Sequence, residues 1–197
     1  MHWAYQKKGK ELRQGDVIKN NGKLKSILTK YTNSEYSEAE YFLVLNQSCD
    51  LVNRGDNNNI ICVAPKIVFS VIRTLKETFD VYSDKYWNFD NYLKDKPDSF
   101  KLAFKDSLKR ALITNASYKN DYENFKERLF NNNEKDYFFL YREPSVGWNK
   151  DMCAFLRECF VIDISQYKLI AKNKILRLSM PFQHKLGYLY GQHYTRI

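Results

Sequence analysis

The sequence predicts an α+β protein, in which a small bent antiparallel sheet or small β-barrel carries a helical insertion and a C-terminal helix. Short apolar runs bounded by turn residues occur near both ends of the chain, which is typical of strands. Between them, apolar residues recur at helical spacing. With 197 residues, of which 44% are hydrophobic, the chain is long enough for a single domain with a sizeable core.

Strand signals dominate the first 65 residues. Gly15 to Ile18 and Leu24 to Leu28 flank Asn20-Asn21-Gly22, and this pattern predicts a hairpin because Asn-Gly supplies the positive φ angles of tight turns. Tyr41 to Leu45 is apolar throughout, which predicts a strand buried on both faces. Asn59 to Pro65 predicts its partner strand, which ends at the proline because proline cannot donate to a ladder.

The middle of the chain changes to helical spacing. Phe100 to Leu112 and Tyr118 to Phe130 each carry apolar residues three or four positions apart, and Pro97 excludes one continuous helix. We therefore divide the predicted single domain into a β-rich core over 1–65 and 136–180, a helical insertion over 66–135 and a C-terminal helix over 181–197.

Strand character returns after residue 135. Tyr137 to Tyr141, Phe155 to Ile164 and Ile175 to Leu178 predict three further strands. Pro181 suits the first turn of a helix, and Ser179 is a candidate N-cap.

The formal charge of +9 is concentrated at the two ends of the chain. Residues 1–30 hold eight Lys or Arg against two acids, and residues 166–197 hold six against none. If the two ends meet in space, they form one basic face that attracts phosphate backbones. A solvated, solubilising surface has the same composition, so both interpretations stay open.

Cysteine usage and the N-terminus indicate a cytoplasmic protein with free thiols. Cys49, Cys62, Cys153 and Cys159 form no CxxC pair, and Met1 is followed by His, Trp and lysines rather than by an apolar signal region. No apolar run approaches the roughly 20 residues of a membrane helix. We therefore predict no membrane association. The absence of recognised ligand spacings and nucleotide-binding motifs further predicts no metal and no cofactor.

The polar residues that end the buried strand are the first candidate site. Ser48, Cys49 and Asp50 place a hydroxyl, a thiol and a carboxylate together, with Gln47 beside them. Cys49 is a nucleophile if His184 or His193 lies alongside it. Asp50 instead caps the next turn through its carboxylate, or it holds phosphate or ribose together with Ser48.

The C-terminal segment is the second candidate site. A helix N-terminus with a nearby Arg177 is a natural anion site, to which Lys185 and Arg196 add charge. A plain docking helix with a solvated polar face fits the same residues. Aromatic side chains interleaved with this charge suit base stacking or protein partners equally: Tyr188, Tyr190 and Tyr194.

The first 65 residues resemble the PemK/MazF type of toxin. The shared plan is the opening Gly15 to Ile18, the apolar strand Phe42 to Leu45 and a strand that closes on Pro65. The resemblance implies an SH3-like barrel that dimerises and cleaves single-stranded RNA without a metal. That family uses an Arg at the strand entrance and a Ser or Thr beyond it. Here no Arg stands at the entrance, so Ser48 supplies the hydroxyl and Arg54 supplies charge from a loop.

The whole chain also resembles uncharacterised bacterial proteins found near defence and mobile-element genes. We therefore predict a nucleic-acid-directed protein of a bacterial toxin–antitoxin or anti-phage defence system, acting on RNA in preference to DNA as a metal-independent endoribonuclease. Its predicted catalytic residues are Ser48, Cys49, Asp50 and His184, and its predicted nucleic-acid contacts are Gln47, Arg54, Arg177, Lys185 and Arg196. The alternative is a non-enzymatic module that binds a larger effector protein from the same operon.

Overall fold

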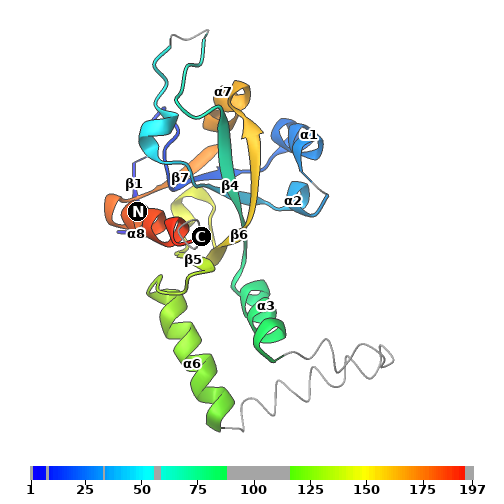
Figure 1. The fold of residues 1–197 in the computed structure, drawn as a ribbon, viewed down its shortest axis with the longest axis vertical. Helices are drawn as coiled ribbons and strands as arrows, with labels where there is room; N and C mark the ends of the chain where they lie inside the picture. Colours follow the sequence, from blue (N-terminus) through cyan, green and yellow to red (C-terminus); the bar gives the residue numbers. More distant parts are fainter. Residues whose placement is uncertain (1, 8, 33, 56–58, 88–115, 194–197) are drawn as a thin grey trace. The chain divides into compact units, whose positions relative to one another are not determined.

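The computed structural model describes residues 2–7, 9–32, 34–55, 59–87 and 116–193. The chain divides into two compact units, Met1–Thr74 with Lys135–Ile197, and Leu75–Glu134. The first unit is a bent antiparallel sheet with helices on both faces, so the predicted α+β class is confirmed (Figure 1).

Within the described residues, the sheet of the first unit has seven strands, and every neighbouring pair is antiparallel. Strands from the two ends of the chain lie side by side, because the last strand inserts between the first two. In spatial order the strands are β1 (Tyr5–Gln6), β7 (Lys174–Leu178), β2 (Asp16–Lys19), β3 (Tyr41–Val44), β4 (Lys66–Thr74), β6 (Met152–Asp163) and β5 (Tyr137–Leu140).

A large bulge bends the sheet between its two longest strands, β4 and β6. Ser70 pairs with Cys159 while the next residue, Val71, pairs with Phe155, so residues 156–158 have no partner on β4. The Ser70 hydroxyl donates to the Phe155 carbonyl at 2.8 Å and satisfies one of the backbone groups that the bulge frees. Extra residues in one strand increase local twist and bend, which accounts for the curl of the sheet.

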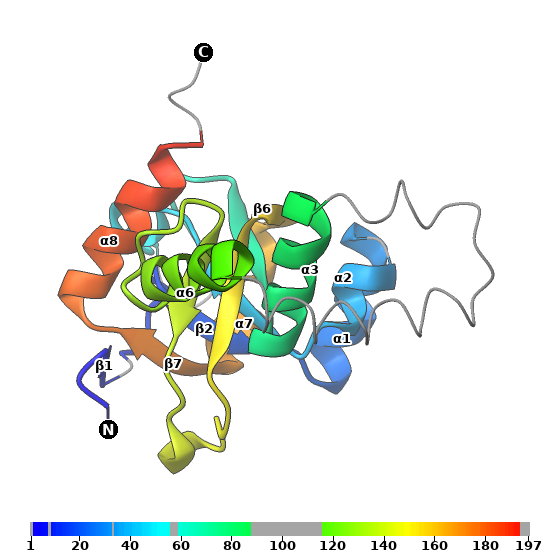
Figure 2. The same cartoon turned by 90° about the horizontal axis from the view of Figure 1, so that it is seen from below.

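Among the described residues, four helices cover the two faces of this sheet (Figures 1 and 2). They are α1 (Gly22–Tyr31), α2 (Ser34–Glu38), α7 (Tyr167–Lys172) and α8 (Met180–Gly191). Helix α8 packs Leu186 and Leu189 into the core on one face. Helices α1 and α7 pack into a second core on the opposite face, through Leu24, Leu28 and Ile170. None of the helices described has both the length and the apolar character needed to cross a membrane.

The predicted hairpin around Asn20-Asn21-Gly22 is wrong. A helix, α1, begins at Gly22, and Asn21 occupies its N-cap position. Leu24 and Leu28 stand four residues apart, so in a helix both reach the same core, and both are fully buried. Tertiary burial of this pair therefore decides the structure of a segment that carries a strong local turn signal.

The predicted partner strand over Asn59 to Pro65 is also wrong. The strand that pairs with β3 is β4, which begins at Lys66, so the helical part of the chain begins at Leu75 rather than at residue 66. The segment before β4 instead packs on the residues that follow β3. The Arg54 backbone N–H donates to the Ile61 carbonyl at 2.8 Å, and that of Ala64 donates to the Asp50 carbonyl at 3.1 Å.

The remaining strand predictions and the C-terminal helix are confirmed. The buried run at Tyr41 becomes β3, with all four residues buried, and the three later apolar runs become β5, β6 and β7. Pro181 lies in the first turn of α8, and Ser179 occupies the N-cap position without a side-chain hydrogen bond.

The second unit contains α3 (Leu75–Trp87) and α6 (Ala116–Phe130). The second helix predicted for the insertion is therefore confirmed as α6, and the one over 100–112 lies outside the described residues. Tyr82 and Phe125 stack at 3.5 Å between ring centroids, and Phe79 packs on Phe125 at 5.8 Å. These aromatic contacts join α3 to α6.

Candidate functional site

The polar residues after β3 form a short 3-10 helix, η1 (Ser48–Leu51), which gathers a hydroxyl, a thiol and a carboxylate. The Ser48 hydroxyl accepts the backbone N–H of Gln14 at 3.2 Å. The exposed Cys49 thiol lies 3.5 Å from Asp50 Oδ1 and 3.7 Å from Gln47 Oε1. Three of the predicted catalytic residues are therefore adjacent, together with Gln47.

The capping role predicted for Asp50 belongs to another residue. No described backbone N–H donates to the Asp50 carboxylate. The side chain of Asn53 has this role, since its Oδ1 accepts from the backbone N–H of Gly55 at 3.1 Å and of Ile61 at 3.0 Å. Asn53 thus closes the loop, and the Asp50 carboxylate keeps acceptor capacity for a ligand or a proton.

His184 does not pair with Cys49. It lies exposed on α8 and forms no hydrogen bond or ion pair with a described residue. Both polar neighbours of the thiol are acceptors, whereas a catalytic thiol requires a base or a cation beside it. The geometry therefore gives no support to a Cys–His nucleophile.

Helix α8 nevertheless docks near η1 through Gln14. The Gln14 side chain donates to the Leu45 carbonyl at 2.9 Å, and its backbone N–H reaches Ser48. A Cβ added at Gly187 of α8 would lie 3.2 Å from Gln14 Oε1, so glycine allows this close approach. Gln14 therefore lies between the strand end and the C-terminal helix.

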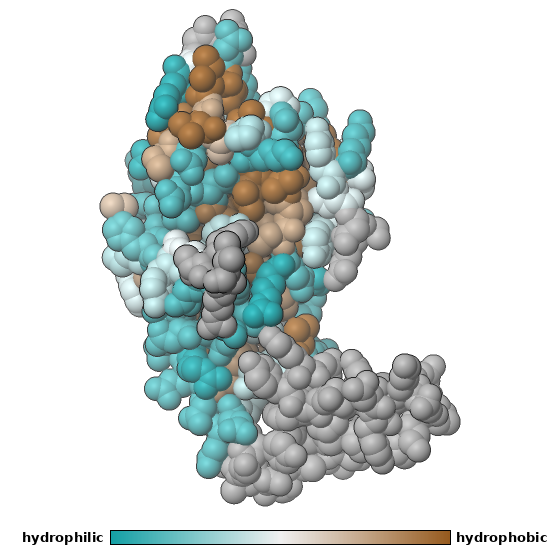
Figure 3. Space-filling model, viewed as in Figure 1, coloured by the Kyte–Doolittle hydropathy of each residue, from teal (hydrophilic) through white to brown (hydrophobic). Residues whose placement is uncertain are grey.

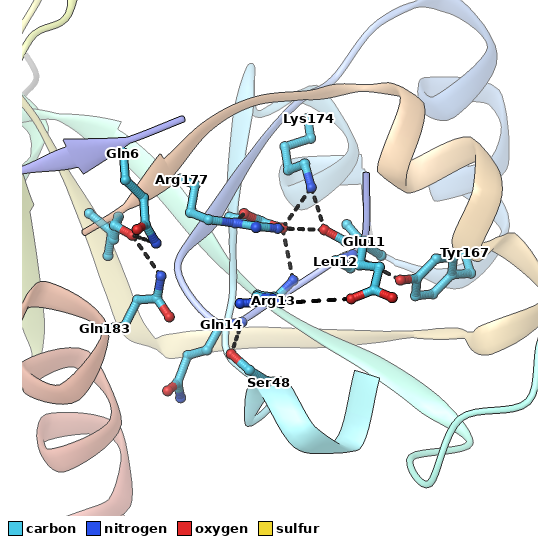
Figure 4. A network of polar contacts seen from close by, with 12 residues as sticks. Gln6, Glu11, Leu12, Arg13, Gln14, Ser48, Tyr167, Lys174, Arg177 and Gln183 are labelled. Atoms are coloured by element: carbon cyan, nitrogen blue, oxygen red, sulfur yellow. Dashed lines mark hydrogen bonds and ion pairs between the residues drawn. The ribbon is translucent and has the colours of Figure 1, made fainter. Parts of the chain in front are cut away.

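Arg177 lies in a buried ion network that joins β2 to β7 (Figure 4). Asp16 is completely buried, and Arg177 donates to its two carboxylate oxygens from Nε at 2.7 Å and from Nη2 at 3.0 Å. Lys174, also buried, lies 3.2 Å from the same carboxylate. The Glu11 carbonyl accepts from both cations, and the Arg13 backbone N–H donates to Asp16 at 2.8 Å.

Lys174 is a member of this network that the sequence analysis missed. Its only signal in the sequence is its place in the acid-free C-terminal segment, and nothing there distinguishes it from exposed lysines. The sequence shows the Gly15-Asp16 opening as a motif. It does not show the partner of Asp16, because Arg177 lies about 160 residues away in the chain.

The two basic ends of the chain meet in the sheet, as β1 and β2 both pair with β7. The Leu12 backbone N–H donates to the Tyr167 hydroxyl at 2.9 Å, which holds the N-terminal loop against α7. Exposed basic side chains come from both ends of the chain in this region: Lys7, Lys10, Arg13, Lys19, Lys168 and Lys172.

The other predicted contacts are spread more widely. Arg54 is exposed in the loop after η1, and Lys185 is half-buried on α8. Arg196 lies outside the described residues, as does Tyr194.

An aromatic cluster was missed by the sequence analysis. Trp3 is 69% exposed, and its ring lies 4.9 Å from Phe182 and 5.9 Å from Tyr141. The imidazole of His2 stacks on Tyr141 at 4.4 Å. One part of the cluster comes from the N-terminus, Tyr141 directly follows β5, and Phe182 lies on α8. The sequence shows that aromatic residues are frequent near the chain ends, but it does not show that these rings meet.

Glu143 anchors this cluster. Its buried carboxylate accepts from the backbone N–H of His2 and from the Ser145 hydroxyl. The Ser145 hydroxyl and the His2 amide hold the pKa of Glu143 below its ordinary value, because they stabilise the charged form. The N-terminus is thereby held beside Tyr141.

The other thiols are poorly suited to chemistry. Burial raises the pKa of Cys159 to about 11 and also raises that of Cys62, and Cys153 is fully buried. Across the described ranges, no three His, Cys, Asp or Glu side chains are grouped so that they could hold a metal ion. Comparisons of the sequence with protein-family models and with curated proteins give no match.

We predict that Asp16→Asn destabilises the first unit by about 3–5 kcal/mol, because it removes the only carboxylate that two buried cations share in the described network. The control is Glu38→Gln, which breaks the exposed Lys25–Glu38 pair (2.6 Å) and should cost about 0–1 kcal/mol. Urea unfolding followed by circular dichroism measures both. Equal losses in the two variants would contradict the structural role of Asp16.

We predict that a thiol reagent modifies Cys49 first, because Cys49 is the exposed cysteine and the other three are wholly or partly buried. Mass spectrometry after brief alkylation of the folded protein should find one modified peptide, and Cys49→Ser should abolish the fast phase. Fast modification of Cys62 in its place would show that the loop after η1 is packed differently.

Proposed function

We propose that this protein acts on nucleic acid, RNA in preference to DNA, as part of a bacterial toxin–antitoxin or anti-phage defence system. The observation that carries the proposal is the pairing of both basic chain ends with each other through β1, β7 and β2. The basic residues lie at opposite ends of the sequence, and this pairing brings them to one part of the sheet.

Binding depends on the exposed basic side chains of this region. Arg177 and Lys174 are buried against Asp16, but the lysines of the N-terminal loop and of α7 are exposed. Lysines that neutralise phosphates release condensed counterions, so their contribution to affinity falls steeply with salt. A basic surface of this kind binds nucleic acid without reading its sequence.

The aromatic cluster at Trp3 supports single-stranded nucleic acid as the ligand. Trp3 precedes β1 by two residues, and β1 pairs with Arg177 through Gln6. Trp3 is therefore an exposed ring on the same chain segment as the exposed Lys7 and Lys10, and it offers an unpaired base a stacking partner.

For catalysis we infer a metal-independent ribonuclease reaction at η1. The Asp50 carboxylate would take the proton of the ribose 2′-OH, whose oxygen attacks the adjacent phosphate and displaces the 5′-oxygen of the next nucleotide, which takes a proton from water. The Ser48 hydroxyl, held by Gln14, would donate to the phosphate oxygens as charge develops. Arg54 in the following loop would add positive charge.

A second candidate function, a non-enzymatic interaction module, is favoured by an exposed apolar surface. Figure 3 shows hydrophobic side chains gathered over β4 and β6. Val68 and Val161 are cross-strand partners there, and Val161 is 42% exposed. Contiguous exposed apolar surface is typical of a protein-binding face.

We predict salt-dependent binding of single-stranded RNA that requires the N-terminal lysines. The variant Lys7→Glu/Lys10→Glu should bind more weakly at low salt and show a shallower dependence of log affinity on log salt, because phosphate contacts are lost. Fluorescence anisotropy measures both quantities. The control Lys76→Glu/Lys150→Glu has the same change in charge at exposed lysines elsewhere and should retain the wild-type slope. Equal losses in the two double variants would argue against a localised basic site.

We predict that the purified protein cleaves single-stranded RNA in EDTA and leaves 2′,3′-cyclic phosphate ends. Asp50→Ala and Ser48→Ala should each lower the rate by about 10²-fold or more, since each removes a group that acts in the transition state. Asp121→Ala and Ser165→Ala, at exposed sites elsewhere, are the controls. If the folded protein cleaves nothing, the interaction module becomes the better account.

A further inference from the structure

We propose that Arg177 and Gly9 form a binding site for a single phosphate group, and that this group belongs to the backbone of the bound nucleic acid. The nucleic-acid part of this assignment rests on the function proposed above. The site is separate from η1. The evidence for it is that one guanidinium nitrogen of Arg177 donates to no described residue.

The guanidinium of Arg177 is only partly used by the fold. The residue is 4% exposed, and its Nε and Nη2 atoms donate to Asp16 and to the Glu11 carbonyl. The third nitrogen, Nη1, donates to no described residue. Nη1 is not one of the fully buried side-chain nitrogens that lack a partner, so it reaches solvent and its two N–H groups are open to a ligand.

The surrounding charge favours an anion. One buried carboxylate, that of Asp16, faces two buried cations, Arg177 and Lys174. Glu11 contributes its backbone carbonyl to both cations, while its half-exposed carboxylate lies 3.8 Å from Arg13. An anion is therefore the kind of ligand that the charge of Arg177 attracts.

Gly9 lies beside this nitrogen, Nη1. A Cβ added at Gly9 would lie 3.1 Å from Arg177 Nη1, closer than most real Cβ contacts. Glycine therefore keeps a side chain away from the unused nitrogen. Lys7 lies two residues before the glycine and Lys10 directly after it; both are exposed and add positive charge.

The chemistry selects phosphate. A guanidinium donates to oxyanions in a fixed planar geometry, and it is the preferred protein group for phosphate. Because Asp16 fixes Nε and Nη2, the remaining nitrogen is oriented before the ligand arrives, which lowers the entropic cost of binding. The predicted contact is thus one phosphate at Nη1.

The test uses Gly9→Val, which places a side chain against Nη1 and leaves every charge in the protein unchanged. The matched control is Gly22→Val, because a Cβ at Gly22 meets nothing within 4 Å. A direct change at Arg177 would disturb the buried network and the fold, whereas Gly9 is exposed. Circular dichroism and thermal unfolding confirm that both variants are folded.

Two probes separate this inference from the proposed function. With a labelled oligouridylate, Gly9→Val should bind at least about tenfold more weakly than Gly22→Val. Its plot of log affinity against log salt should be shallower by about 0.7, the value of one single-strand phosphate contact. With inorganic phosphate, the wild type and Gly22→Val should be stabilised over chloride at equal ionic strength, and Gly9→Val should not.

Equal RNA binding and equal salt slopes for the two glycine variants would overturn the site and leave the nucleic-acid function standing. Stabilisation by phosphate that Gly9→Val abolishes, without RNA binding by the wild type, would overturn the nucleic-acid assignment and retain a phosphate site. Equal stabilisation of all three proteins by phosphate would place the anion elsewhere and overturn the inference.

Discussion

The buried carboxylate of Asp16 is the constraint on which the arrangement of the chain ends depends. Asp16 and Arg177 are directly opposite each other on neighbouring strands, so the ion pair and the register specify one another. A slip of one residue would turn one of the two side chains to the other face and leave a buried charge without its partner. The net free energy of such a pair is small, because desolvation offsets attraction, but the penalty for misalignment is large.

The parts of the fold that the sequence predicts correctly are those set by local signals. The run Tyr41 to Leu45 and Pro181 at the start of α8 are local signals that no distant contact opposes, and both predictions are confirmed. At Asn21-Gly22 the local signal indicated a turn, but Leu24 and Leu28 bury better in a helix. The sequence does not predict β4, because Pro65 indicates the end of a strand, whereas β4 begins directly after it.

In the candidate site, too, the sequence predicts which residues lie together only where they are neighbours in the chain. Ser48, Cys49 and Asp50 are consecutive, so their proximity required only that the strand end be placed correctly. The partners of Arg177 and the rings around Trp3 come from segments far apart in the chain. Contacts of this kind follow from the strand order β1-β7-β2, in which the last strand inserts between the first two. No local pattern encodes that insertion.

The buried network and the strand end are coupled through two consecutive residues. The Arg13 N–H donates to Asp16, and the next N–H along the chain, that of Gln14, donates to Ser48. A backbone segment held at both of these points transmits a shift at either one, so the position of the Ser48 hydroxyl depends on an intact Asp16–Arg177 pair. Loss of activity on substitution of Asp16 or Arg177 would therefore not identify either as a catalytic residue. Changes outside the shared segment, at Gly9 on one side and at Asp50 on the other, would separate the proposed phosphate binding from the proposed chemistry.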